Sequence, residues 1–355
     1  MDIAEFGLER WFGEYEHEAD IMLAESGIRP LDSSRFDTDP GELNYVIPTD
    51  GDPEFRAEVG ERYDRGPDEV CFTCGTQEAN LLVFLSLLDA DDHVVVVTPT
   101  YQALQAVPES ICDVTTVDLQ EPAWTLDVDA VADAMRPETK LVVLNNPNNP
   151  TGRYHDEAVV GELYDLAAAH DAYLLCDEVY RLLDDEPLPP VASMGDYGIS
   201  TTSLTKAYGL AGLRFGWIAG PEDVVQDAVR WKDYTTISPP IFGQHVARQA
   251  LGEQEDEILA ENRELAARNR GIVREFVHEH GLDWHDPVGV NGFVTVPDGF
   301  EDAREFCVRV VEDESVVLAP GDLFGFPGYW RLGFGLPTDE LEAGLDRVSR
   351  VIEAA

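Results

Sequence analysis

Short, continuous runs of apolar residues alternate with helical patterns over roughly the first 240 residues. Six such runs lie at Val70–Thr73, Val94–Thr98, Leu141–Leu144, Tyr173–Cys176, Ser200–Ser203 and Phe215–Ala219. Their lack of polar alternation is typical of strands buried on both faces of a sheet. Helical patterns between runs lie at Gln77–Leu88, Tyr101–Pro108, Val128–Met135 and His155–His170. This repetition predicts an α/β fold with a mostly parallel sheet flanked by helices.

The pattern differs beyond about residue 240. A helix is expected over Ile241–Leu251, and the long, charged segment Glu255–His280 predicts a connecting helix that leaves the first domain. Shorter strand and helix signals follow at Gly292–Val296, Asp302–Asp313, Val316–Leu318, Trp330–Phe334 and from Thr338 onward. Mixed short elements of this kind predict a smaller α+β domain.

The first 35 residues contain one expected helix, Glu5–Glu25, and too little else to bury a core of their own. We therefore expect them to pack on the smaller domain. The predicted organisation is a large domain over residues 36–254 and a discontinuous small domain from residues 1–35 and 255–355. The helix over about 255–280 would join the two.

The balance of charge restricts the partners of the chain. Lys plus Arg number 24 and Asp plus Glu 70, so the formal net charge of the 355 residues is −46. We expect no nucleic-acid or membrane partner, because so acidic a surface repels phosphates and anionic lipid. The 44% of hydrophobic residues excludes simple disorder. Acidity runs along the whole chain and only three basic residues are lysines, which favours a cytoplasmic protein of a halophile over an ordinary acidic protein.

Targeting and metal-binding signals are weak. The N-terminal sequence MDIAEFGLER is acidic, where a secretory signal would be basic and then apolar. The longest apolar stretch, Leu81–Leu88, has about half the length of a membrane span. Cys71 and Cys74 form a C-x-x-C pair, but the other three cysteines are isolated. We therefore expect structural cysteines and no metal site.

The most informative segment runs from Ser203 to Trp217 and reads SLTKAYGLAGLRFGW. It follows a predicted buried strand and places Lys206, one of only three lysines, in a glycine-rich turn. Desolvation and nearby positive charge lower the pKa of a lysine and make its amine nucleophilic. Arg214 offers a guanidinium that can bind phosphate through two hydrogen bonds. From this segment alone, a surface lysine in a flexible loop is the alternative.

Three further segments place polar groups where predicted strands end. Asn149 lies in a stiff Asn- and Pro-rich turn at the carboxyl end of a strand, where open α/β sheets bind ligands. Asp177 ends a buried strand and requires a cationic or donating partner, and Tyr180 follows three residues later. Gly75 precedes a helix whose N-terminus suits one phosphate. A plain turn and a structural ion pair are the alternatives for Asn149 and Asp177.

Together these segments resemble the class I/II aminotransferases, the fold-type-I pyridoxal-phosphate enzymes, over nearly the whole chain. The motifs N-P-x-N-P-T-G, D-E-x-Y and S-x-x-K-x-x-G-x-x-G-x-R stand in the family's order within Asn145–Gly152, Asp177–Tyr180 and Ser203–Arg214. The resemblance implies an aspartate-aminotransferase-like fold. It also implies pyridoxal 5′-phosphate as cofactor and exchange of an amino group between an L-amino acid and a 2-oxo acid.

The resemblance also implies a role for each matching residue. Lys206 would carry the cofactor through a Schiff base, and Asp177 would pair with the ring nitrogen. Tyr180 and Asn149 would bond the ring oxygen, and Tyr101 would stack on the ring face. The phosphate would be held by Gly75, Thr76, Gln77, Ser203 and Arg214.

For the substrate, the resemblance implies that Arg331 holds the carboxylate, with Asn149 beside it and Gly27 in a loop nearby. A planar carboxylate suits the fork of an arginine better than a lysine. In relatives, a tyrosine placed as Tyr45 is here reaches the site of the partner subunit. We therefore expect a homodimer with shared active sites.

Two alternatives remain open. The shared motifs only generate a carbanion, so a lyase or cyclase of the same fold, C–S lyase-like or capreomycidine-synthase-like, fits them too. The segments Ala24–Pro30 and Cys74–Asn80 resemble the branch with capreomycidine-synthase-like enzymes, which cyclise an arginine derivative. A ligand-sensing relative without catalysis is the option from another class, and the intact Lys206, Asp177 and Arg331 argue against it. The sequence does not reveal the amino donor and acceptor.

We predict that activity and dimerisation require molar KCl or NaCl. Repulsion among the excess carboxylates opposes the compact state, and at 1 M salt the Debye length falls to ~3 Å and screens that repulsion. Activity and sedimentation should both be measured across a KCl series, and both are expected to decline as salt is removed. Full activity in dilute buffer would contradict the prediction.

Overall fold

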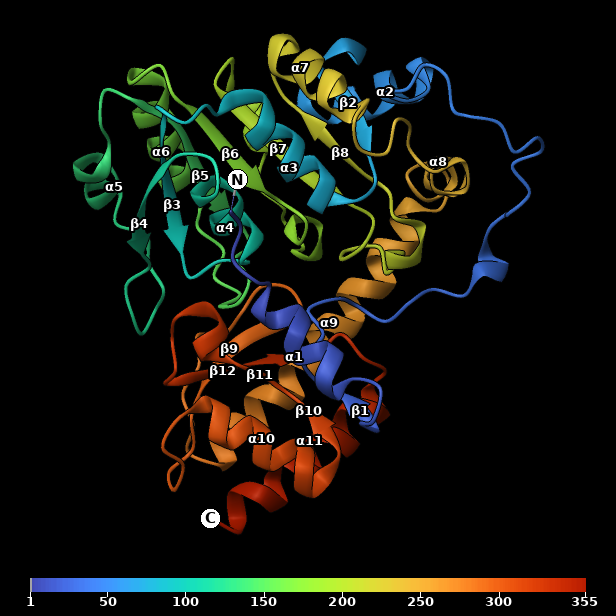
Figure 1. Cartoon of the computed structure of the whole chain (residues 1–355). Coiled ribbons are helices and arrows are strands. Elements are labelled where there is room, and N and C mark those ends of the chain that lie inside the picture. Colours follow the sequence, from blue (N-terminus) through green and yellow to red (C-terminus); the bar gives the residue numbers. More distant parts are fainter. Residues whose placement is uncertain (1) are drawn as a thin grey trace.

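The computed structural model describes residues 2–355 as two bodies of unequal size. The larger body lies at the top in Figure 1 and the smaller one below it. The larger body is built around a seven-stranded sheet in the order β2-β8-β7-β6-β5-β3-β4. Its strands are β2 (Val70–Thr73), β3 (His93–Thr98), β4 (Asp113–Asp118), β5 (Thr139–Asn145), β6 (Tyr173–Asp177), β7 (Gly198–Ser203) and β8 (Gly216–Ala219). The predicted α/β fold with a mostly parallel sheet is confirmed, since only β8 runs in the direction opposite to the other six strands.

Both faces of this sheet are covered by helices, so its central strands are almost entirely buried. On β3, Val94 and Val96 pack on one face while Val95 and Val97 pack on the other. The helices are α3 (Thr76–Leu87), α4 (Ala103–Glu109) and α7 (Glu222–Lys232) on the first face, and α5 (Val128–Ala134) and α6 (Glu157–Ala169) on the second. This arrangement leaves the carboxyl edge of the parallel strands free to form a site.

Aspartates fix where several helices begin. The carboxylates of Asp52, Asp127, Asp156 and Asp302 accept backbone N–H bonds at the starts of α2 (Pro53–Gly60), α5, α6 and α10 (Ala303–Glu314). Each such cap contributes about 1 kcal/mol to the stability of a helix. Part of the acidity of the chain therefore has a local structural use.

The smaller body contains a three-stranded antiparallel sheet in the order β11-β12-β9. Its strands are β9 (Asn291–Thr295), β11 (Ala319–Pro320) and β12 (Tyr329–Gly333). The helices α10 and α11 (Thr338–Glu353) pack beside it. The N-terminal residues join this body, because β1 (Ile21–Met22) pairs with β10 (Val316–Val317) and the indole N–H of Trp11 donates to the Leu318 carbonyl.

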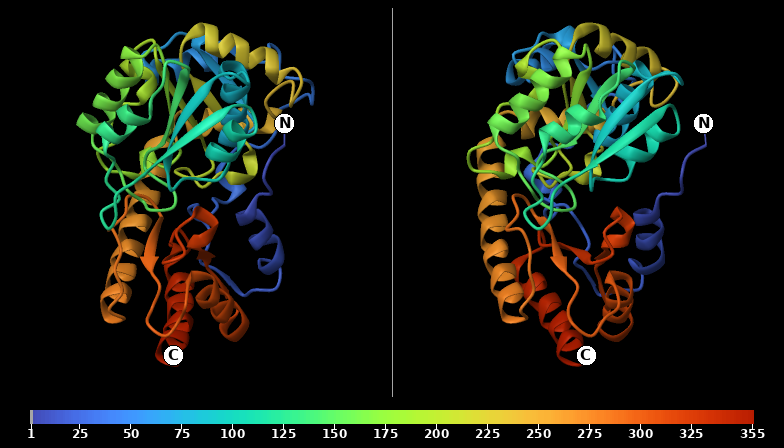
Figure 2. Two further views of the ribbon diagram at one scale, coloured as in Figure 1. Left: turned by 60° about the vertical axis from the view of Figure 1, so that its left-hand side comes forward. Right: turned by 90° about the vertical axis from the view of Figure 1, so that its left-hand side faces the viewer.

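One long helix, α9 (Glu255–Glu279), runs along both bodies. Figure 2 shows it on the opposite side of the lower body from α1 (Gly7–Tyr15). The predicted helix over Glu5–Glu25 was too long, since the helix ends at Tyr15. The reason is tertiary, because pairing with β10 holds Ile21 and Met22 extended.

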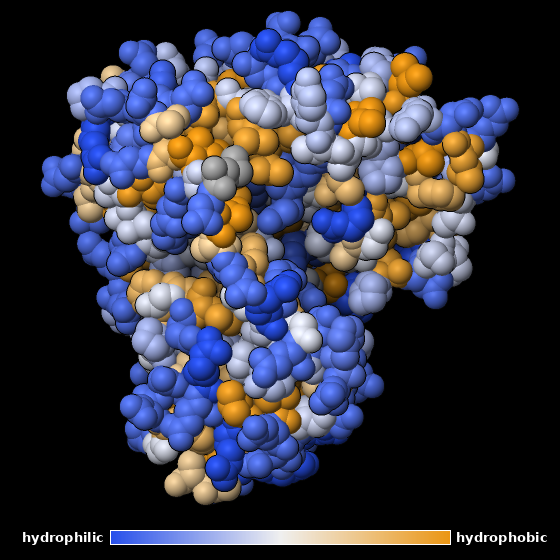
Figure 3. Space-filling model, viewed as in Figure 1, coloured by the Kyte–Doolittle hydropathy of each residue, from blue (hydrophilic) through white to orange (hydrophobic). Residues whose placement is uncertain are grey.

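An arm of residues 37–48 projects from the larger body between α1 and α2, and it is the blue loop at the right in Figure 1. Its side chains Leu43, Tyr45 and Ile47 are exposed. Figure 3 shows hydrophobic surface on this projection. The helix α8 (Ile241–Ala250) contacts the start of this arm, since the Asp37 N–H donates to Gln249 Oε1, and α8 also exposes Phe242. Within residues 2–355, no helix has the length and apolarity needed to cross a membrane.

Candidate active site

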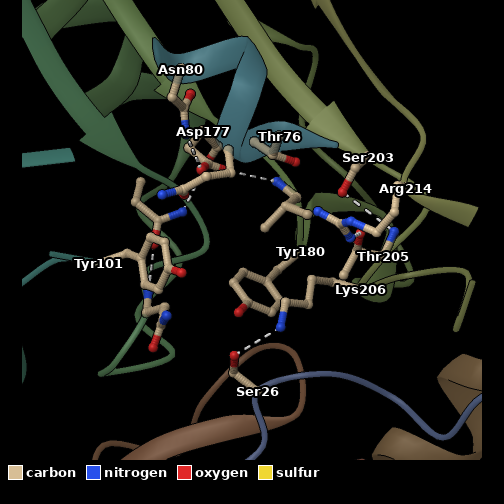
Figure 4. A pocket seen from close by; sticks show the side chains of 14 residues that line it. Ser26, Thr76, Asn80, Tyr101, Asp177, Tyr180, Ser203, Thr205, Lys206 and Arg214 are labelled. Carbon is tan, nitrogen blue, oxygen red and sulfur yellow. Dashed lines mark hydrogen bonds between the residues drawn. The ribbon is translucent and has the colours of Figure 1, made fainter. Parts of the chain in front are cut away.

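Three polar residues end neighbouring parallel strands at one edge of the sheet. Asn145 ends β5, Asp177 ends β6 and Ser203 ends β7, and the first two are paired in register. A pocket opens at this edge and is shown in Figure 4. It is lined by Ser26, Thr76, Gln77, Asn80, Tyr101, Asn145, Asn149, Asp177, Val179, Tyr180, Ser203, Thr205, Lys206 and Arg214. The sequence motifs, which are spread between Thr76 and Arg214, thus meet in one place.

The Asp177 carboxylate is buried at the bottom of this pocket and is held from two sides. One oxygen accepts from Asn80 Nδ2 at 3.0 Å, and the other accepts from the Val179 backbone N–H at 3.2 Å. Thr201 Oγ1 in turn donates to Asn80 Oδ1 at 2.6 Å. Burial raises the pKa of Asp177 to about 6, although these donors and the Lys206 charge act to lower it. The carboxylate is thus oriented and ready to pair with a positive or N–H group.

Lys206 extends into the pocket from the turn after β7. Its Nζ donates to Ser26 Oγ at 3.1 Å, a contact drawn in Figure 4. Burial lowers the pKa of the amine; Glu25 opposes this effect and the charge of Arg331 adds to it. Gly27 lies beside the lysine, since a Cβ built there would stand 3.8 Å from Nζ. The structure therefore places a nucleophilic amine next to the predicted substrate loop.

The turn from β2 into α3 forms a cradle for an anion together with Arg214. Gly75 has φ +84°, and a Cβ there would stand 2.6 Å from Arg214 Nη2, so only glycine leaves room for the guanidinium. Thr76 Oγ1 is buried without a hydrogen-bond partner at the start of the helix. The Ser203 and Thr205 hydroxyls line the same side of the pocket. Hydroxyls, a guanidinium and a helix N-terminus are the donors that a phosphate requires.

Arg331 joins the two bodies behind the pocket wall. It is 1% exposed, and its Nη1 donates to Asn149 Oδ1 at 2.9 Å while Nη2 donates to the Ala24 carbonyl at 2.6 Å. Its Nε is buried without a partner, and the guanidinium lies 5.2 Å from the Phe324 ring centroid. Burial lowers the pKa of Arg331. A buried guanidinium with a free donor suits a planar carboxylate.

Two tyrosines border the pocket. Tyr101 follows β3 and packs against Phe6, with ring centroids 5.2 Å apart, while Gly7 N–H bonds Gln102 Oε1 at 2.9 Å. The start of α1 is thereby tied over the aromatic wall of the pocket. Burial raises the pKa of both Tyr101 and Tyr180, so both carry a phenolic proton at neutral pH.

Most of the candidate residues gather here, and a few results differ. Tyr45 does not line the pocket of its own chain and lies on the exposed arm. Sequence reasoning missed five lining residues, Ser26, Asn80, Asn145, Val179 and Thr205. Helical spacing could have revealed Asn80, because it lies four residues after Thr76 on the same helix face.

Potential metal ligands and free thiols are the other chemistry-bearing groups among residues 2–355. No cluster of three or more potential metal ligands is found there. Cys71 and Cys74 are free thiols, and burial raises the pKa of both.

Comparison with known proteins places the chain among well-described relatives. The sequence profile described as "Aminotransferase class I and II" matches residues 13–348. Capreomycidine synthase of Streptomyces vinaceus is 33% identical, and the match covers 96% of this chain and 92% of the synthase. Aspartate/prephenate aminotransferase of Thermus thermophilus is 29% identical, and the match covers 89% of this chain and 85% of that relative. The structure of a PLP-dependent aminotransferase from Streptococcus suis superimposes with a TM-score of 0.94 at 32% identity. The superposition covers 100% of this chain and 99% of that one.

The raised pKa of Asp177 predicts a specific dependence of stability on pH. Suppose that the pKa of a carboxyl is higher in the folded than in the unfolded chain. Its contribution to stability is then fully present at pH values below the pKa in the unfolded chain, and it is lost as the pH rises through the pKa in the folded chain. Asp177→Asn does not titrate. Its free energy of unfolding, minus that of the unchanged protein, should therefore grow between pH 4 and about 6 and then level off. The gain is of the order of 3 kcal/mol for a two-unit shift.

Urea unfolding of the ligand-free protein in molar KCl measures this difference. The exposed Asp91→Asn is the matched control and should show no such trend. A difference for Asp177→Asn that is flat across pH would show that the side chain is not buried as described.

Proposed function

The chain belongs to the class I and II aminotransferases, and from that membership we propose that it moves an amino group between an L-amino acid and a 2-oxo acid. Pyridoxal 5′-phosphate is the cofactor of this family. The observation that carries the proposal is the meeting of a lysine, a fixed carboxylate and an anion cradle in one pocket. When bound, the cofactor supplies an electron-withdrawing ring that stabilises negative charge at the substrate Cα.

The residues of the pocket fit this cofactor. The cradle of Gly75, Thr76, Gln77, Ser203 and Arg214 would hold the phosphate, with the unpartnered Thr76 hydroxyl as one donor. Asp177 would pair with the ring nitrogen. Tyr180 and Asn149 would hydrogen-bond the ring oxygen, and Tyr101 would cover the ring face.

The protein's own contribution is orientation and proton transfer. Lys206 would hold the cofactor and, as a free amine of lowered pKa, would move the proton between the substrate Cα and the cofactor's C4′. Arg331 binds the substrate carboxylate through its free donors, and Asn149 keeps the guanidinium in place. The buried Asp177 carboxylate would favour the protonated form of the ring nitrogen that it faces.

A second candidate is a lyase or cyclase that uses the same residues. It is supported by the 33% identity to capreomycidine synthase of Streptomyces vinaceus. Both candidates begin with removal of the Cα proton, so they differ only in what the product becomes.

We also propose a homodimer in the cytoplasm of a halophilic organism. Leu43, Tyr45 and Ile47 are exposed on an otherwise acidic chain, and contact with a second copy would remove this apolar surface from water. Tyr45 would enter the partner's pocket. The folding units we propose are residues 36–254 and residues 1–35 with 255–355, and the β1–β10 pairing supports the second one.

Amino acids supplied with 2-oxoglutarate in molar KCl should yield glutamate and the matching 2-oxo acid. Lys206→Ala should abolish the yellow absorbance of the bound cofactor and lower the rate at least about 10³-fold, since the amine performs the proton transfer. Absorbance and a glutamate assay measure the two effects. Formation of pyruvate and ammonia without a 2-oxo acid acceptor would reject transamination in favour of the lyase. Yellow colour that survives Lys206→Ala would refute the cofactor assignment.

Mixing two inactive variants tests the shared site. In a dimer of Lys206→Ala and Tyr45→Ala subunits, one of the two sites combines an intact Lys206 with the partner's intact Tyr45. Random re-association should therefore restore about a quarter of the activity of the unchanged protein. If Tyr45 acts within its own chain, or not at all, mixing will give no gain over the separate variants.

A further inference from the structure

A buried ion pair lies directly behind the anion cradle. Glu78 stands in the first turn of α3, and one of its oxygens accepts from the Cys74 backbone N–H at 2.6 Å. Lys232, at the end of α7, places its Nζ 3.5 Å from the same oxygen. The lysine is 0% exposed and the glutamate 8% exposed. Figure 1 shows α7 alongside α3.

Two threonines complete the network. The Thr235 and Thr236 hydroxyls each donate to the other Glu78 oxygen at 2.7 Å, and Lys232 Nζ bonds Thr236 Oγ1 at 2.6 Å. Burial alone would raise the pKa of Glu78. Lys232, the Cys74 N–H and the two hydroxyls outweigh burial and lower it, so the carboxylate is charged at neutral pH.

This arrangement has an electrostatic consequence for the cradle. A carboxylate in the first turn of a helix stabilises that helix, but it competes with a second anion for the positive potential of the same end. Lys232 supplies the compensating charge. The bond to Cys74 N–H also fixes the backbone just before Gly75, where a small displacement would close the space that the Arg214 guanidinium occupies.

We propose that Lys232, acting through Glu78, is a positioning residue for the phosphate cradle. It neutralises the helix-end carboxylate and holds the turn from Thr73 to Thr76 in the shape that accepts phosphate. The inference rests on the proposed cofactor, because it assigns the cradle to the cofactor's phosphate. Lys232 touches neither substrate nor cofactor in this scheme, so its effect is confined to phosphate affinity.

Comparing pyridoxal 5′-phosphate with pyridoxal separates this effect from general damage. Lys232→Met should weaken the binding of pyridoxal 5′-phosphate at least about ten-fold, because it leaves an unpaired carboxylate beside the phosphate. It should also reduce the rise in melting temperature that inorganic phosphate gives to the protein. The affinity for pyridoxal, which lacks the phosphate, should change less than about two-fold.

Three further variants keep the test decisive. Thr236→Val retains both charges and serves as the test if Lys232→Met folds poorly. It should show a smaller loss of affinity for pyridoxal 5′-phosphate. In the double variant Lys232→Met with Glu78→Gln, the amide oxygen still accepts the Cys74 N–H and no charge is left unpaired, so phosphate affinity should recover. Arg347→Met breaks an ion pair to Asp20 in the smaller body and should alter neither affinity.

The outcomes distinguish this inference from the proposed function. Equal losses of affinity for pyridoxal and for its phosphate in Lys232→Met would show that the pair is only structural, and unchanged phosphate affinity would overturn the inference as well. A wild-type protein without Lys206-dependent yellow absorbance would overturn the proposed function instead. In that case the shift in melting temperature with inorganic phosphate still decides the role of Lys232.

Discussion

The Asp177 carboxylate, kept out of water at the end of a central strand, is the constraint on which the site depends. A buried carboxylate is tolerated only where donors hold it, and Asn80 and the Val179 N–H do so here. Asn80 lies in α3, so the same requirement fixes that helix against the sheet and aims its N-terminus into the pocket. The anion cradle and the Asp177 carboxylate are therefore positioned by one set of hydrogen bonds.

The second organising contact is the arginine that crosses between the two bodies. Arg331 comes from β12 of the smaller body, yet it bonds Asn149 of the larger one and a carbonyl of the N-terminal segment. A ligand carboxylate bound at its free Nε would thus be linked through Arg331 to the smaller body, the larger body and the N-terminal segment at once. The specificity of such a site depends on how the bodies are joined, as well as on the side chains that line it.

The sequence predicts six of the seven strands of the large sheet to within two residues, because burial on both faces leaves runs without polar alternation. The edge strand β4 escapes notice, since its pattern Asp-Val-Thr-Thr-Val-Asp is mostly polar. The motifs predict the gathering of Lys206 and Asp177, which lie at adjacent strand ends. Local patterns cannot reveal the Ser26 bond to Lys206 or the Glu78–Lys232 pair, whose partners lie 180 and 154 residues apart.

The three lysines have three different surroundings. Lys206 lies in the pocket, Lys232 is sealed in the interior, and Lys140 is exposed near the start of β5. An amine-directed dye or surface linker would therefore react with one lysine on the outside of the molecule. Five residues separate Lys140 from Asn145 at the pocket edge, which is ~17 Å along a strand. Lys140 is thus a single exposed lysine for immobilisation or fluorescent labelling, at a distance from the pocket.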